Sequence, residues 1–306
     1  MTTQAIPTRA PSAAVPVGVR ALGLLAAAGT LPYLIIKLLW LSGSTVGARE
    51  PAFLSDPTTV VANAITFAMD LVVVVLAFAL TSPWGERLPA WLVLLPMWVG
   101  SGFLVPMAVA ILPAAVVHTL TTTSPPGVFE PWLQPVVYGG FAWQGVFLTA
   151  AFVAHAVRRW SGVVAADAAP PTPLVPLLRV ITTGGCVMAG SSAVLHLGVG
   201  LTGGSAVLLG VHAAHAALAV AGAAGVVALV RSRAGSPWMA TAAAWTGSAA
   251  MFSWGLYPVV VAMAAHAYAN GTTASGTAHV TGLLGGFALA VAGMLALVGG
   301  GERRRG

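Results

Sequence analysis

Long uninterrupted runs of apolar residues constrain this chain more than any other feature of its sequence. Each run has about 20 residues or more, the length that an α-helix needs to cross the hydrocarbon core of a bilayer. Of the 306 residues, 58% are hydrophobic and only 7% are charged, which is too few charges to cover a water-soluble surface. The sequence lacks the ten-residue alternation of an outer-membrane β-barrel. We therefore predict an all-α, polytopic membrane protein.

The runs divide into eight predicted transmembrane helices. The first run follows two arginines, as a signal peptide does, but it is too long for a signal-peptide core, so we interpret it as an uncleaved span. The loops between the runs are too short to contain a soluble domain. The predicted spans are 17–42, 60–81, 91–118, 132–158, 177–200, 205–230, 238–269 and 280–299.

The basic residues predict the orientation of these helices. Arg49 is the only arginine in a loop assigned to the outside, and the other arginines fall on the opposite side, which the positive-inside rule makes cytoplasmic. We therefore expect a multi-pass protein of a bacterial plasma membrane, with both termini in the cytoplasm. The net charge of +6 is explained by this orientation, so we expect a lipid bilayer as partner and no nucleic acid.

The two halves of the chain repeat a pattern, which predicts an internal duplication. Trp98 and Ser101 recur 147 residues later as Trp245 and Ser248, and the string GGFA at 139–142 recurs at 285–288. We predict a first four-helix repeat over 1–160, a cytoplasmic linker over 161–173 and a second four-helix repeat over 174–306. Since each repeat has an even number of spans, the copies run in the same direction, as in transporters with parallel repeats.

Polar residues in the first two spans form one candidate site for a substrate or a proton. Asn63, Thr66 and Asp70 share one face of the second span, because they are spaced at helical intervals. Lys37, with Tyr33 one turn before it, lies near the outer end of the first span and could pair with Asp70. Charged groups in a membrane are costly and therefore need a reason. The alternatives are a structural ion pair, or a protonated Asp70 beside a Lys37 that extends to the interface.

Histidines form a second set of candidates, for a metal ion or haem. Six of the seven lie in the predicted outer half, and His212 and His215 can point the same way because they are three residues apart. The alternatives are a proton relay and the ordinary preference of histidine for the membrane interface. No familiar metal-binding motif is present, so we predict no cofactor by default. The candidates are His118, His196, His212, His215 and His266.

The strings LPYLIIKLLWLSGS and PWGERLPAWLVLLPMWVGSG resemble uncharacterised multi-pass membrane proteins of actinobacteria, a resemblance that implies no activity. The architecture is also similar to that of haem A synthase, which has eight spans in two parallel halves. The glutamate-to-histidine signature in the second span of that family is absent, since this span contains Asp70 and no histidine. The similarity therefore implies a shared architecture and gives no residue a role.

Three functions follow as hypotheses. The first is a small secondary transporter, with protons or a small molecule bound near Lys37 and Asp70. The second is a non-catalytic scaffold or accessory subunit, in which the buried polar groups are structural. The third is a membrane redox enzyme that binds haem or a metal through histidines. The sequence contains no pattern of residues that assigns an enzymatic reaction.

Overall fold

The computed structural model describes residues 15–121, 127–161, 172–231, 237–264 and 273–303. These residues are helical, apart from short turns and an isolated β-bridge between Ala48 and Phe129. Seven of the helices are long and apolar enough to cross a membrane. The prediction of an all-α, multi-pass membrane protein is confirmed at this level.

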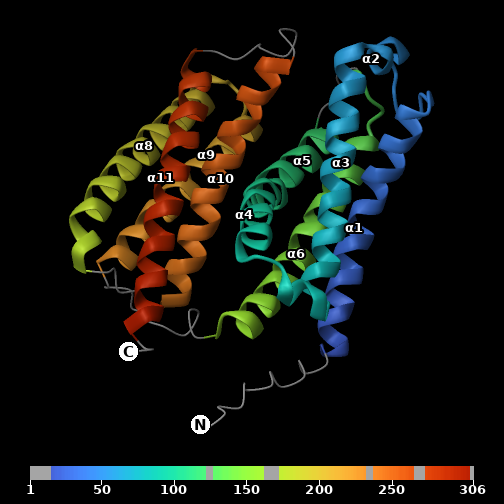
Figure 1. The fold of residues 1–306 in the computed structure, drawn as a ribbon. Helices are drawn as coiled ribbons and strands as arrows, with labels where there is room; N and C mark the ends of the chain where they lie inside the picture. Colours follow the sequence, from blue (N-terminus) through green and yellow to red (C-terminus); the bar gives the residue numbers. More distant parts are fainter. Residues whose placement is uncertain (1–14, 122–126, 162–171, 232–236, 265–272, 304–306) are drawn as a thin grey trace, which may run out of the picture.

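The helices follow the predicted spans in order (Figure 1). The short elements are α2 (Pro51–Ser55) and two 3₁₀ turns (Pro83–Arg87 and Thr172–Leu174). The seven membrane-crossing segments exclude α10, whose predicted span continues into residues outside the described part of the chain. The long elements are α1 (Val17–Leu41), α3 (Pro57–Leu80), α4 (Ala90–Pro106) with a π-helical turn (Met107–Ile111) and α5 (Leu112–Thr121), α6 (Leu133–Arg159), α8 (Val175–Thr202), α9 (Ala206–Val230), α10 (Pro237–Ala264) and α11 (Thr273–Arg303).

Local sequence explains where some helices begin and bend. The carboxylate of Asp56 accepts hydrogen bonds from the backbone N–H groups of Thr58 and Thr59, and Pro57 occupies the first helical position of α3. The π-helical turn between α4 and α5 lies between Pro106 and Pro113, two residues that cannot donate to the helical hydrogen-bond ladder. One predicted boundary is wrong: the last helix begins at Thr273, about two turns before the expected position 280.

The long helices form two groups that stand side by side, with α4 between them (Figure 1). Helices α8, α9, α10 and α11 pack on one another around a core of small and branched residues that includes Ala189, Val226 and Leu289. In the other group, α1 packs against α3 and α6 around a core that includes Ala26 and Leu80. We call the end with residues 82–89 the inner end and the end with residues 42–56 the outer end, after the predicted orientation.

Helix α4 joins the two groups, because it packs along α10 more closely than along its own neighbours in sequence. Three hydrogen bonds cross this contact. The hydroxyl of Ser253 donates to the carbonyl oxygen of Val99 (2.9 Å). The indole N–H of Trp98 donates to the hydroxyl of Ser248 (3.1 Å), and the indole N–H of Trp245 donates to the hydroxyl of Ser101 (2.8 Å). The two tryptophan–serine bonds are reciprocal, because each helix supplies one tryptophan and one serine to them.

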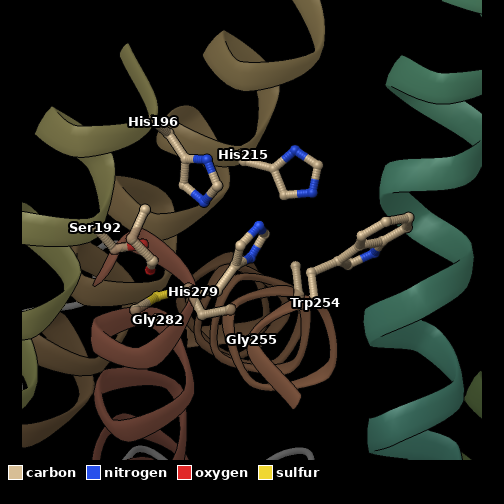
Figure 2. A pocket seen from close by; sticks show the side chains of 10 residues that line it. Ser192, His196, His215, Trp254, Gly255, His279 and Gly282 are labelled. Carbon is tan, nitrogen blue, oxygen red and sulfur yellow. The ribbon is translucent and has the colours of Figure 1, made fainter. Parts of the chain in front are cut away.

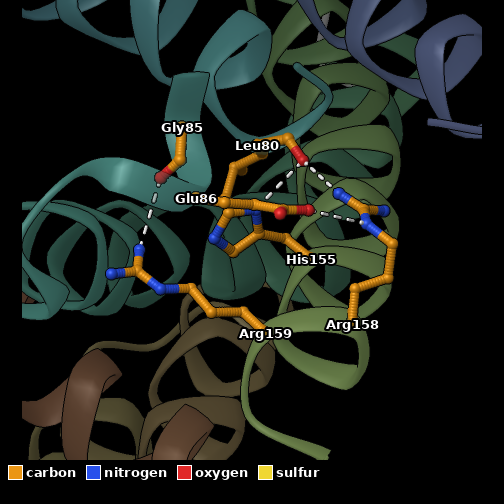
Figure 3. A network of polar contacts seen from close by, with 6 residues as sticks. All are labelled: Leu80, Gly85, Glu86, His155, Arg158 and Arg159. Atoms are coloured by element: carbon orange, nitrogen blue, oxygen red, sulfur yellow. Dashed lines mark hydrogen bonds and ion pairs between the residues drawn. The ribbon is translucent and has the colours of Figure 1, made fainter. Parts of the chain in front are cut away.

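At the inner end, the last turn of α6 fastens the loop between α3 and α4 (Figure 3). The carbonyl oxygen of Leu80 at the end of α3 accepts from Nδ1 of His155 (3.2 Å) and from the guanidinium of Arg158 (3.0 Å). Arg159 donates to the carbonyl oxygens of Gly85 (3.3 Å) and Leu88. These donors add hydrogen bonds to carbonyl groups at the end of α3 and in the loop after it, where the carbonyl oxygen of Gly85 also accepts from the backbone N–H of Leu88 (3.3 Å).

Candidate functional site

The first candidate site lies between α1 and α3. The ammonium of Lys37 donates to the side-chain oxygen of Asn63 at 2.5 Å, and both side chains are buried. The same nitrogen lies 4.7 Å from the ring centroid of Tyr33 and 5.0 Å from that of Trp40, within the range of a cation–π contact. The structure therefore surrounds this cation with one amide and two aromatic faces.

The expected partner of Lys37 does not reach it. The ion pairs among the described residues are Arg49 with Glu130 and Arg158 with Glu86, so Lys37 and Asp70 do not form a direct salt bridge. Asp70 is buried on α3, and its Oδ2 atom has no hydrogen-bond partner within the described part of the chain. Lys37 therefore binds the amide of Asn63, whereas the sequence suggested that it would pair with the carboxylate of Asp70.

Tyr33 and Thr66 complete this cluster. The hydroxyl of Thr66 donates to the carbonyl oxygen of Ala62 (2.8 Å), and the carbonyl oxygen of Asn63 lies 3.2 Å from the same hydroxyl. Four of the five residues predicted for this site, Tyr33, Lys37, Asn63 and Thr66, are thus joined by hydrogen bonds or ring contacts. The fifth, Asp70, lies on the same helix face, two turns from Asn63.

The second candidate site lies in the other helix group, in the predicted outer half. Nδ1 of His196 on α8 lies 2.9 Å from Nδ1 of His212 on α9. The ring centroid of His196 is 5.3 Å from that of His215 on α9 and 5.2 Å from that of His279 on α11. Four imidazoles from three helices therefore gather at one depth.

A small cavity lies among these rings (Figure 2). Its volume available to the centre of a water-sized sphere is about 10 Å³, roughly that of one water molecule. Nε2 of His215 and Nδ1 of His279 are buried and have no hydrogen-bond partner among the residues that the structure describes, and both residues line the cavity. Such orphaned nitrogens are uncommon in folded proteins and call for an explanation.

The structure separates the remaining histidine candidates from this cluster. His118 lies near the end of α5 and does not line the cavity. His266 lies outside the described residues. His279 was not among the predicted candidates, because the sequence placed it at the very start of the last helix, where it would lie at the membrane surface. Since α11 begins at Thr273, His279 lies almost two turns inside the helix.

The chemistry of the two clusters differs. The first combines a buried cation with an unpaired carboxylate, a combination suited to exchanging a proton or binding a polar solute. The second offers neutral nitrogen lone pairs, which are suited to a proton or a metal ion. As the rings stand, no three His, Cys, Asp or Glu side chains of the described residues are already arranged around one ion.

Comparisons with known proteins leave the assignment to this geometry. No protein-family model, no curated protein and no solved structure matches the chain.

Proposed function

We propose that this chain is a small proton-coupled secondary transporter, and that Lys37, Asn63 and Asp70 form its coupling site. The proposal puts the protein in the plasma membrane of a bacterium, with both termini in the cytoplasm. The observation that carries it is the open arrangement of the two buried charges. Asp70 has an unpartnered carboxylate oxygen, while Lys37 is bound to a neutral amide.

A purely structural role would favour a closed ion pair. Placing a charged side chain at mid-membrane costs about 2.5–3.5 kcal/mol by insertion measurements, and a direct contact between opposite charges recovers part of that cost. Here the two groups are both buried and do not touch. A carboxylate that takes up and releases protons, by contrast, must not be locked in a permanent ion pair with its neighbours.

The reciprocal contact between α4 and α10 supports the duplication on which this proposal draws. Trp98 and Ser101 match Trp245 and Ser248 in sequence, and each tryptophan binds the serine of the other helix. An interface in which residue i contacts j while the equivalent of j contacts the equivalent of i is the property of a twofold axis. Parallel repeats related by such an axis are a common transporter architecture.

The test uses purified protein in vesicles that enclose a pH-sensitive dye. Amino acids, sugars, carboxylic acids and amines are added outside one at a time, and the internal pH is followed. At least one solute should change the internal pH in wild-type vesicles, because a coupled transporter moves protons with its substrate. Asp70→Asn should abolish that response while the yield of folded protein persists.

Asp56→Asn is the matched control, since it makes the same chemical change on the same helix. Asn is as good an N-cap as Asp, so this variant should keep the wild-type response. A response that survives Asp70→Asn would contradict the proposal, as would the absence of any response to the panel. In the latter case, normal folding of a Lys37→Met, Asp70→Leu double variant would favour the scaffold hypothesis.

A further inference from the structure

The histidine cavity between α8, α9, α10 and α11 is not used by the transporter proposal. Three histidines line it, His196, His215 and His279, together with Met251. Figure 2 shows the three imidazole rings close to one another. Each comes from a different helix, so the packing of the whole second group holds them in place.

A backbone contact fixes which nitrogen of the His215 ring carries the proton. Nδ1 of His215 lies 2.9 Å from the carbonyl oxygen of Val211. A carbonyl oxygen only accepts, so this ring nitrogen must be the donor. In the neutral ring Nε2 of His215 is then a bare lone pair. Within the described part of the chain, neither this Nε2 nor Nδ1 of His279 has a hydrogen-bond partner.

His196 completes the pattern through His212. The two Nδ1 atoms are 2.9 Å apart, so one of them donates to the other. When the proton is on His196, its Nε2 is another lone pair and His212 orients the ring. The rings of His196 and His215 then have the arrangement typical of metal-ligating histidines, in which the nitrogen away from the ion donates to a second group.

We propose that His196, His215 and His279 form a binding site for a copper ion in the Cu⁺ state. A nitrogen ligand lies about 2.0 Å from such a metal, so two ligating imidazoles have ring centroids roughly 5 Å apart. The centroid distances from His196 to the other two rings, 5.3 and 5.2 Å, have this value. Because no three ligand groups of the described residues yet face one point, small rotations about the Cβ–Cγ bonds must accompany binding. These torsions have broad energy wells.

The surroundings favour Cu⁺ among the metals that imidazole binds. The described residues that line the cavity include no carboxylate, so a single positive charge is less costly to bury there than a double one. Met251 is among the residues that line the cavity, and its side chain contains a thioether, a soft ligand of the kind that Cu⁺ prefers. The cavity has room for about one water molecule, which fits an ion and not a porphyrin.

The experiment measures Cu⁺ binding to the purified full chain under anaerobic conditions, in competition with bathocuproine disulfonate. Wild-type protein should bind one Cu⁺ per chain, with an X-ray absorption spectrum that shows imidazole nitrogens. His215→Gln and His279→Gln should each weaken binding roughly 100-fold or more, since even loss of a second-shell group can cost that much. His118→Gln, which removes a histidine away from the cavity, should bind like wild type.

A second measurement needs no variant and covers the case in which the glutamine variants fail to fold. Wild-type protein is treated with diethylpyrocarbonate with and without Cu⁺, and the modified histidines are identified by mass spectrometry. Copper should protect His196, His215 and His279 and leave His118 as reactive as before. Copper well below one per chain, affinity unchanged in both glutamine variants, or equal protection of His118 would each overturn the proposal. None of these outcomes bears on the transport assay.

Discussion

Arginine side chains at the inner end do more than set the orientation of the helices. The sequence explained Arg158 and Arg159 only by the positive-inside rule, yet both donate to carbonyl oxygens of the neighbouring loop. Nε of Arg158 also lies 3.5 Å from Oε1 of Glu86, which makes an ion pair. These carbonyl groups lie at the end of α3 and in the loop that follows it, where the helical hydrogen-bond ladder stops. Side-chain hydrogen bonds from α6 therefore hold the loop between α3 and α4, whereas the sequence alone explained these arginines by their charge.

Replacing Arg159 by alanine tests this role. The variant loses its hydrogen bonds to the carbonyl oxygens of Gly85 and Leu88, so we expect the free energy of unfolding to fall by about 1–3 kcal/mol. The measurement is unfolding by SDS in mixed micelles. Arg87→Ala is the control, because Arg87 is exposed in the same loop and carries the same charge. Equal losses in the two variants would show that charge, and not hydrogen bonding, matters here.

At the residue scale, the sequence predicted which groups of the first site share a face but not which ones bind. Helical spacing put Asn63, Thr66 and Asp70 together because that pattern depends on local geometry alone. The choice of Asn63 as the partner of Lys37 depends on how far α1 and α3 are shifted along each other, a tertiary property. The histidine cluster is similar: His212 and His215 were visible as a pair, but their meeting with His196 and His279 requires the packed bundle.

At the level of whole helices, close approach between α10 and α11 shapes the histidine cavity. A Cβ atom on Gly255 would lie 2.5 Å from the carbonyl oxygen of His279 and 2.6 Å from the backbone nitrogen of Leu283. Glycine lets the two backbones approach this closely, as small residues do at many membrane helix contacts. The depth of His279 relative to the other rings is therefore set by the absence of a side chain on the opposite helix.

Gly255→Ala should force these helices apart. We expect the free energy of unfolding to fall by about 1–3 kcal/mol, the usual effect of overpacking, with a matching loss of Cu⁺ affinity as His279 moves. Gly190→Ala on α8 makes the same change where a Cβ atom meets nothing within 4 Å, so it should leave the stability unchanged or raise it. SDS unfolding compares the two variants. A Gly255→Ala protein as stable as Gly190→Ala would contradict the tight contact.

The helices themselves were largely predictable, and the one clear error has a physical cause. Apolar runs located the spans because the bilayer demands a fixed length of apolar helix. The predicted start of the last helix is too late because the first turns of that helix, in the segment TASGTAHVTG, are too polar for hydropathy to detect. The side chains of Thr277 and Thr281 donate to carbonyl oxygens one turn back, so they need no water and tolerate the helix.

On the scale of the whole molecule, the joint between α4 and α10 decides how the two helix groups meet. Pseudo-symmetry predicts that its two tryptophan–serine hydrogen bonds contribute similarly to the stability. Trp98→Phe and Trp245→Phe should therefore each lower the free energy of unfolding by about 0.5–1.5 kcal/mol, since phenylalanine keeps a ring but loses the N–H donor. The exposed Trp91 gives the control: Trp91→Phe should leave the stability unchanged.

A strongly unequal result for the two joint variants would argue against the duplication. The stacking contacts of each tryptophan survive in a phenylalanine variant, because Trp98 lies against Phe252 and Trp245 against Phe152. The comparison therefore isolates the hydrogen bonds. SDS unfolding of all three variants in one series provides the measurement.

The contact between α4 and α10 also determines when, during synthesis of the chain, the fold can be completed. Trp98 and Ser248 are 150 residues apart, and a ribosome adds about 5–20 residues each second, so the serine emerges on the order of 10–30 seconds after the tryptophan. During that interval α4 is already inserted while its main neighbour does not yet exist. During that time the face of α4 that later packs on α10 has no partner in the bilayer. A chain that stalls before α10 would expose this face to the cell's quality-control proteases and chaperones.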